Sequence, residues 1–148
     1  MVASVVIIVL SVAMFVYWFR YSCVLILESD WNEEQARQVA HQNALSFGAL
    51  EETLTRFDSA QDMDRAKDLL ERDLHKLSGL MARCESLQAA GQSMESRLLI
   101  VDFQIMRAWY AVTRSSAAPK AQAALREMYR IVAYMAGEFG DHLATARS

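Results

Sequence analysis

The feature that most constrains this chain is an uncharged, almost wholly apolar run at its N-terminus, residues 1–19. The 18 residues from position 2 to 19 would form about 27 Å of helix, close to the thickness of a hydrocarbon core. Aromatic residues crowd around Arg20 at the far end of the run, which resembles an aromatic belt with one snorkelling cation. We therefore predict that residues 2–19 cross a lipid bilayer, and the predicted membrane-interface residues are Tyr17, Trp18, Arg20 and Tyr21.

A cleaved secretory signal peptide is the main competing interpretation of this segment, and a buried helix of a soluble protein is another. Signal peptides begin with a basic region, have a shorter apolar stretch and end in small residues at the cleavage site. Here no Lys or Arg precedes the run, and bulky aromatic residues stand where small ones are required. The sequence therefore favours a retained anchor.

The positions of Lys and Arg around the run predict its orientation. The N-terminal side carries none, whereas Arg20 and then Arg37 follow on the C-terminal side. By the positive-inside rule, we predict an external N-terminus and a cytoplasmic C-terminal domain. The two cysteines, Cys23 and Cys84, are too few for a disulfide framework, in agreement with that placement.

Charge and motifs exclude several classes of function. Residues 21–148 carry 14 basic and 18 acidic side chains, a net charge of −4 without a basic run. Such a balance is not typical of nucleic-acid binding or of a polybasic lipid-binding surface. The chain also lacks Gly-rich phosphate loops, a Gly-x-Ser-x-Gly sequence and a His-Glu-x-x-His sequence. We predict a protein that is not an enzyme and does not bind nucleic acid.

Turn-forming residues are scarce and helix-forming residues dominate. With one proline and five glycines in 148 residues, a β-rich fold is disfavoured. Apolar residues at helical spacing predict four helices, over about residues 31–57, 60–90, 93–113 and from Pro119 onward. Gly137 and Gly140 are expected to loosen the last helix or end it early. Short connections between long helices favour antiparallel neighbours.

The predicted fold class is therefore all-α, with an N-terminal single transmembrane helix followed by an antiparallel, up-down four-helix bundle. Residues 1–27 would form the anchor and a juxtamembrane helix, and residues 28–148 would form the soluble domain.

The third soluble helix, residues 93–113, is apolar on nearly every face. Such a helix is surrounded either by its own domain or by a partner. Asp102 and Arg107 interrupt it and lie five residues apart, so they do not face each other. If buried, each needs a partner on another helix. The residues that we predict to bind a partner are Trp31, Leu99, Phe103, Met106, Trp109 and Tyr110.

Helical bundles can hold metal or haem, which makes His41, His75 and His142 candidate ligands. Glu71 precedes His75 by four residues and Glu138 precedes His142 by four, which is not the Glu-x-x-His spacing of di-iron bundles. No Cys-x-x-Cys-His sequence for haem attachment is present. We predict no cofactor and no metal, and a redox bundle is the remote alternative.

Together these patterns predict a membrane-anchored helical binding or scaffold protein, an accessory subunit of a larger membrane-associated complex. Its partners would be the bilayer, through residues 2–19, and a protein or a second copy of the chain, through the third soluble helix. A membrane-tethered sensor bundle is the alternative. The apolar stripe of residues 60–90 suits either an intramolecular core or the coiled-coil seam of a dimer.

Overall fold

The computed structural model of the chain describes residues 1–28, 33–57, 59–83 and 94–147. Within these ranges the protein consists of helices and short turns, with no strand, which confirms the predicted all-α class. The helices are α1 (Val2–Glu28), α2 (Glu33–Gln42), α3 (Phe47–Thr53), α4 (Ala60–Arg83), α6 (Met94–Thr113) and α7 (Ala118–Arg147). Trp31 and Cys84 lie outside the described residues.

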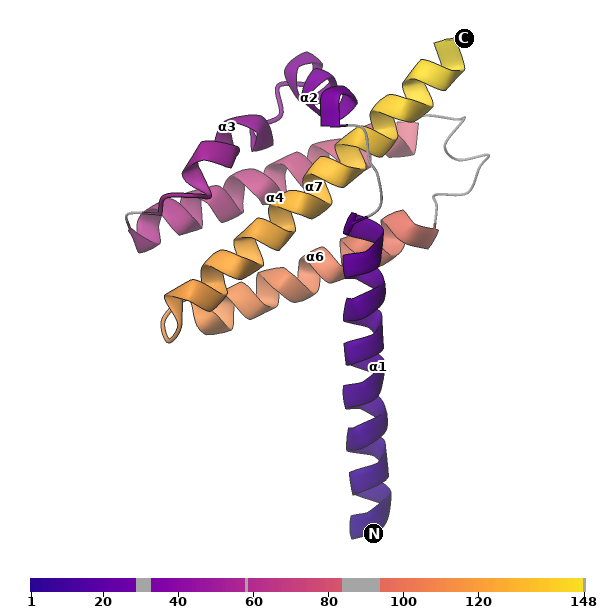
Figure 1. The fold of residues 1–148 in the computed structure, drawn as a ribbon, viewed down its shortest axis with the longest axis vertical. Helices are drawn as coiled ribbons and strands as arrows, with labels where there is room; N and C mark the ends of the chain where they lie inside the picture. The colour runs from indigo at the N-terminus through magenta and orange to yellow at the C-terminus, as the bar shows by residue number, and fades with distance from the viewer. Residues whose placement is uncertain (29–32, 58, 84–93, 148) are drawn as a thin grey trace.

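The first helix, α1, includes the predicted apolar run and continues without interruption through the juxtamembrane residues 21–28. By length and composition it can cross a membrane, and none of its most apolar 18 residues is buried. Figure 1 shows α1 projecting away from the other helices, with the N-terminus at its far end. Only its C-terminal part packs against α6 and α7, where Cys23 is fully buried.

Helix α7 is the element around which the domain is arranged. It packs along α2, α4 and α6 and also contacts α1 and α3 (Figure 1). Its sequence permits contacts on several sides because small residues such as Ala133, Ala136 and Gly137 are buried along it. The predicted up-down four-helix bundle remains a prediction. The contacts show instead that the other helices pack around α7.

The expectation that Gly137 and Gly140 end the last helix was wrong, because α7 runs through both to Arg147. A Cβ atom on Gly140 would stand 3.1 Å from Cγ2 of Val39 and 3.1 Å from Cβ of Gln35. Glycine therefore lets α2 approach α7 closely, and the packing contacts offset the low helix propensity of glycine.

The helix predicted over residues 31–57 is instead two helices, α2 and α3, separated by a turn. Ala44 in this turn has a φ of 49°, in the left-handed region that an α-helix does not use. The backbone N–H groups of Ser46 and Phe47 each donate to Oδ2 of Asp73 at 2.7 Å. Asp73 belongs to α4, so a carboxylate from a different helix satisfies the free donors where α3 begins.

The starts of α4 and α7 and the end of α6 agree with the sequence pattern, whereas the predicted end of the second helix near residue 90 and the predicted start of the third at residue 93 lie outside the described residues. Helix α4 buries the predicted stripe as far as Met81, and α6 covers the predicted third helix almost completely. Steps of three and four residues between apolar positions such as Leu70, Leu74 and Leu77 place them on the face that packs toward the core.

Candidate functional site at the junction of α1, α6 and α7

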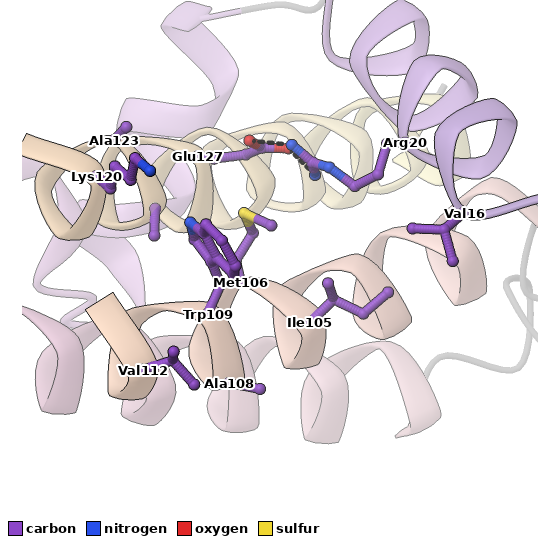
Figure 2. Close-up of a pocket in the computed structure, with 11 residues that line it drawn as sticks. Val16, Arg20, Ile105, Met106, Ala108, Trp109, Val112, Lys120, Ala123 and Glu127 are labelled. Atoms are coloured by element: carbon purple, nitrogen blue, oxygen red, sulfur yellow. Dashed lines mark hydrogen bonds and ion pairs between the residues drawn. The ribbon is translucent and has the colours of Figure 1, made fainter. Parts of the chain in front are cut away.

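Three charged side chains from three helices meet where α1 joins the domain. Arg20 of α1 donates from Nη1 to Oδ1 of Asp102 at 2.6 Å and from Nη2 to Oε2 of Glu127 at 2.7 Å. Its Nη1 also pairs with Oε1 of Glu127, so the guanidinium holds that carboxylate with both nitrogens (Figure 2). Asp102 lies on α6 and Glu127 on α7. This ion cluster joins α1 to both helices through charge-assisted hydrogen bonds, the strongest kind available to side chains.

The ion cluster is largely removed from water. The side chain of Asp102 is 0% exposed, that of Glu127 is 18% exposed and that of Arg20 is 27% exposed. Burial raises the pKa of the Asp102 carboxyl, and the hydrogen bond from Arg20 opposes that shift. Oδ2 of Asp102 has no hydrogen-bond partner among the described residues. One guanidinium thus serves two carboxylates, and removing it would leave both without their cation.

An open groove of about 740 Å³ adjoins the ion cluster between α1, α6 and α7. Figure 2 shows Val16 at its edge on α1, with Trp109 and Met106 between α6 and α7. Lys120 brings a positive charge to walls that are otherwise mainly apolar, whereas Arg20 and Glu127 in the same lining are paired with each other. The residues that line the groove are Val16, Arg20, Ile105, Met106, Ala108, Trp109, Val112, Lys120, Ala123, Ala124 and Glu127.

The structure separates the residues that we predicted to bind a partner. Four of them are buried in the core of this domain, with exposed fractions of 7% or less: Leu99, Phe103, Met106 and Tyr110. Trp109 is 46% exposed and lines the groove. Trp31 lies outside the described residues, so no contact is assigned to it.

The sequence pattern did not identify several exposed apolar residues of α6, among them Val101, Ile105 and Val112, which accompany the predicted Trp109. Because α6 is apolar on nearly all faces, its pattern could not show which face packs inward. The position of Asp102 was the available indication of the inward face, because a carboxylate that must pair inside the protein fixes the rotation of the helix about its axis.

Three of the predicted membrane-interface residues are exposed along α1, namely Tyr17, Trp18 and Tyr21. Arg20 differs from the expectation of a cation that extends toward lipid headgroups. Its guanidinium is directed at Asp102 and Glu127 of the domain.

The prediction that a buried charge of α6 needs a partner on another helix is confirmed for Asp102, and it does not apply to Arg107, which is exposed. Asp102 pairs with Arg20 of α1, whereas Nε of Arg107 lies 2.7 Å from Oε1 of Glu71 on α4. Arg107 itself is exposed, so its ion pair belongs to the surface of the domain.

A second polar contact joins α6 to α4. The hydroxyl of Tyr110 donates to Oδ1 of Asp64 at 2.7 Å, and Arg114 pairs with the other oxygen of the same carboxylate. Burial and the bond to Asp64 both raise the pKa of the Tyr110 hydroxyl. This contact stabilises the packing of the two helices, and none of its three residues lines the groove.

Among the residues that the structure describes, no group of three or more His, Cys, Asp or Glu side chains could hold a metal ion. His41 and His75 are exposed on α2 and α4. Comparison of the chain with protein-family models, with curated proteins and with solved structures gave no match.

Proposed function

We propose that this chain is a membrane-anchored helical binding protein that holds a partner protein at the bilayer surface as an accessory subunit of a membrane complex. In this proposal α1 crosses the bilayer, and the other helices form an antiparallel bundle around α7. The N-terminus lies outside and the domain is cytoplasmic, because Arg20 and Arg37 are the first cations and both follow the apolar run.

The observation that carries the proposal is the ion cluster of Arg20, Asp102 and Glu127. A flexible tether is enough to keep a domain near a membrane. Here α1 continues as one helix into the domain and is bonded to α6 and α7, so these bonds favour one orientation of the domain relative to its anchor. A constant orientation is useful to a protein that must present one face to a partner in or near the same membrane.

The faces of the domain turned away from α1 include α2 and α3 (Figure 1). A hollow of about 770 Å³ lies there, with Phe47 and Tyr129 next to charged residues such as Arg37 and Glu51. The centres of protein interfaces are enriched in aromatic residues and arginine, and their rims are polar. We propose this hollow as the contact surface for the partner protein.

The test is isolation of the tagged full-length protein from its native membranes in a mild detergent, followed by mass spectrometry. The proposal predicts one protein recovered in stoichiometric amount. An Ala49→Arg variant, which places a long cation in the hollow, should lose that protein while staying in the membrane fraction. Recovery of the wild-type chain alone would contradict the proposal.

A membrane-tethered sensor is the second candidate. It is favoured by the ion cluster, in which one guanidinium is shared by two carboxylates and Oδ2 of Asp102 is left without a partner among the described residues. A sensor needs two packings of its helices. The test places one spin label on α1 and one on α4 and measures the distance between them in vesicles. Two separate distances would support the sensor, and a single narrow distance would contradict it.

A further inference from the structure

One face of α6 carries exposed apolar side chains that the domain does not cover. We call Val101, Ile105, Trp109 and Val112 the outer stripe, and their exposed fractions are 50%, 36%, 46% and 66%. Their spacing of four, four and three residues places them on one side of the helix. The buried residues of α6, among them Phe103 and Tyr110, occupy the opposite side. An exposed apolar surface of this kind marks a contact with a partner or with a membrane.

The outer stripe lies on the side of the domain from which α1 projects. Figure 1 shows α6 crossing near the point where α1 leaves the domain. Ile105, Trp109 and Val112 line the same groove as Val16 of α1. Val16 stands one helical turn before Arg20, inside the apolar run, and Figure 2 shows both on the same side of the groove. The end of the apolar run and the outer stripe are therefore at the same level along the anchor.

Cations are more frequent near the outer stripe than in the rest of the chain, as expected for a surface close to lipid headgroups. Residues 94–130, which contain α6 and the first part of α7, carry six Lys or Arg and three Asp or Glu. Two of these cations, Arg107 and Arg114, pair with Glu71 and Asp64 of α4, and the other four lie outside those ion pairs: Arg97, Lys120, Arg126 and Arg130. The whole chain has a net charge of −3. Arg97 on α6 is exposed, and Lys120 lies in the groove. Apolar residues beside cations are typical of helices that lie in a membrane interface and contact anionic lipids.

We propose that α6 lies in the headgroup layer of the bilayer that α1 crosses, with the outer stripe against the lipid acyl chains. Trp109 would sit at the boundary between headgroups and hydrocarbon, where tryptophan is enriched. Arg97 and Lys120 would face the anionic phosphates. This inference rests on the proposed membrane anchor, but it does not depend on the partner that binds the hollow between α2 and α3. The groove that joins the outer stripe to the apolar run of α1, together with the nearby cations, favours lipid over a second protein as the contact of the outer stripe.

The experiment uses the full-length protein in its native membranes, with Val112 replaced by the photoreactive residue p-benzoylphenylalanine. After irradiation, the purified protein is analysed by intact mass. The inference predicts a mass shift equal to one phospholipid. His75, which is exposed on α4, is the control position, and the same replacement there should give no lipid adduct.

A protein adduct at position 112, whether a second copy or another chain, would overturn the inference and assign the outer stripe to a protein interface. Absence of any adduct would also overturn it, because the stripe would then face water. Replacement of Val101 in place of Val112 repeats the test if the first variant does not fold. If the stoichiometric partner is recovered but no lipid adduct forms, only this inference is refuted. If the lipid adduct forms but no partner is recovered, only the proposed function is refuted.

Discussion

Arg20 and Asp102 are separated by 82 residues along the chain, yet Nη1 of the first lies 2.6 Å from Oδ1 of the second. This hydrogen bond connects the end of an exposed apolar helix to a fully buried carboxylate in the domain. A cation at the end of a membrane span ordinarily interacts with headgroups. In this protein the cation at the end of the apolar run is bonded to α6 and α7, which makes the C-terminal part of α1 a component of the tertiary structure.

Replacing Arg20 by Met should destabilise the domain by about 3 kcal/mol, because it leaves the carboxylates of Asp102 and Glu127 without their cation. Urea unfolding in detergent, followed by far-UV circular dichroism, measures the loss. Arg130→Met is the matched control, since Arg130 is exposed on the same helix as Glu127. It should change the free energy of unfolding by less than about 0.5 kcal/mol. Equal effects of the two substitutions would refute a special role for the ion cluster.

The pH dependence of stability should carry a contribution from Asp102. Burial raises its pKa in the folded state, so the folded protein holds this proton more tightly than the unfolded chain. The contribution is fully present below the unfolded-state pKa of about 4 and is lost as the pH rises through the raised folded-state pKa. The difference in free energy of unfolding between wild type and Asp102→Asn should therefore become less favourable to wild type as the pH rises from about 4. A difference that grows with pH would contradict this account.

Asp73→Ala should release the start of α3. The substitution removes the acceptor for the N–H groups of Ser46 and Phe47 and should cost about 1–2 kcal/mol. Hydrogen exchange at these two amides should become faster than in the wild type. Asp68→Ala on the exposed side of α4 is the control and should leave both exchange rates unchanged. Unchanged exchange in Asp73→Ala would show that the cap does not hold α3 in place.

Replacing each of two helical glycines by alanine should change the stability of the protein in opposite directions. Gly79→Ala on α4 meets no atom within 4 Å and should stabilise the protein by about 0.5–1 kcal/mol. At Gly140 the new methyl group would stand 3.1 Å from Cγ2 of Val39 and 3.3 Å from the backbone oxygen of Gln35. Gly140→Ala should therefore lower the melting temperature. Stabilisation by both substitutions would mean that α2 and α7 are not in close contact.

Local sequence pattern predicted the parts of the fold that depend on neighbouring residues. Apolar composition gave α1, and helical spacing gave α4 and α6 with their buried methionines Met63, Met81 and Met106. The requirement that a buried charge have a partner on another helix also held for Asp102.

Long-range contacts decided the features that the sequence pattern missed. The break between α2 and α3 depends on a carboxylate 26 residues further on, in Asp73. The continuation of α7 through Gly140 depends on contact with α2. The inward direction of Arg20 depends on Asp102 and Glu127, which no local pattern around position 20 could supply.

The central claim is that the domain is held at the membrane in order to bind a protein. The most direct measurement replaces Ala49, in the hollow between α2 and α3, by p-benzoylphenylalanine and irradiates the full-length protein in its native membranes. The account predicts one discrete protein adduct, which should be reduced in an Arg20→Met background although the chain stays in the membrane. Absence of a protein adduct at position 49, or an adduct with lipid there, would contradict the account.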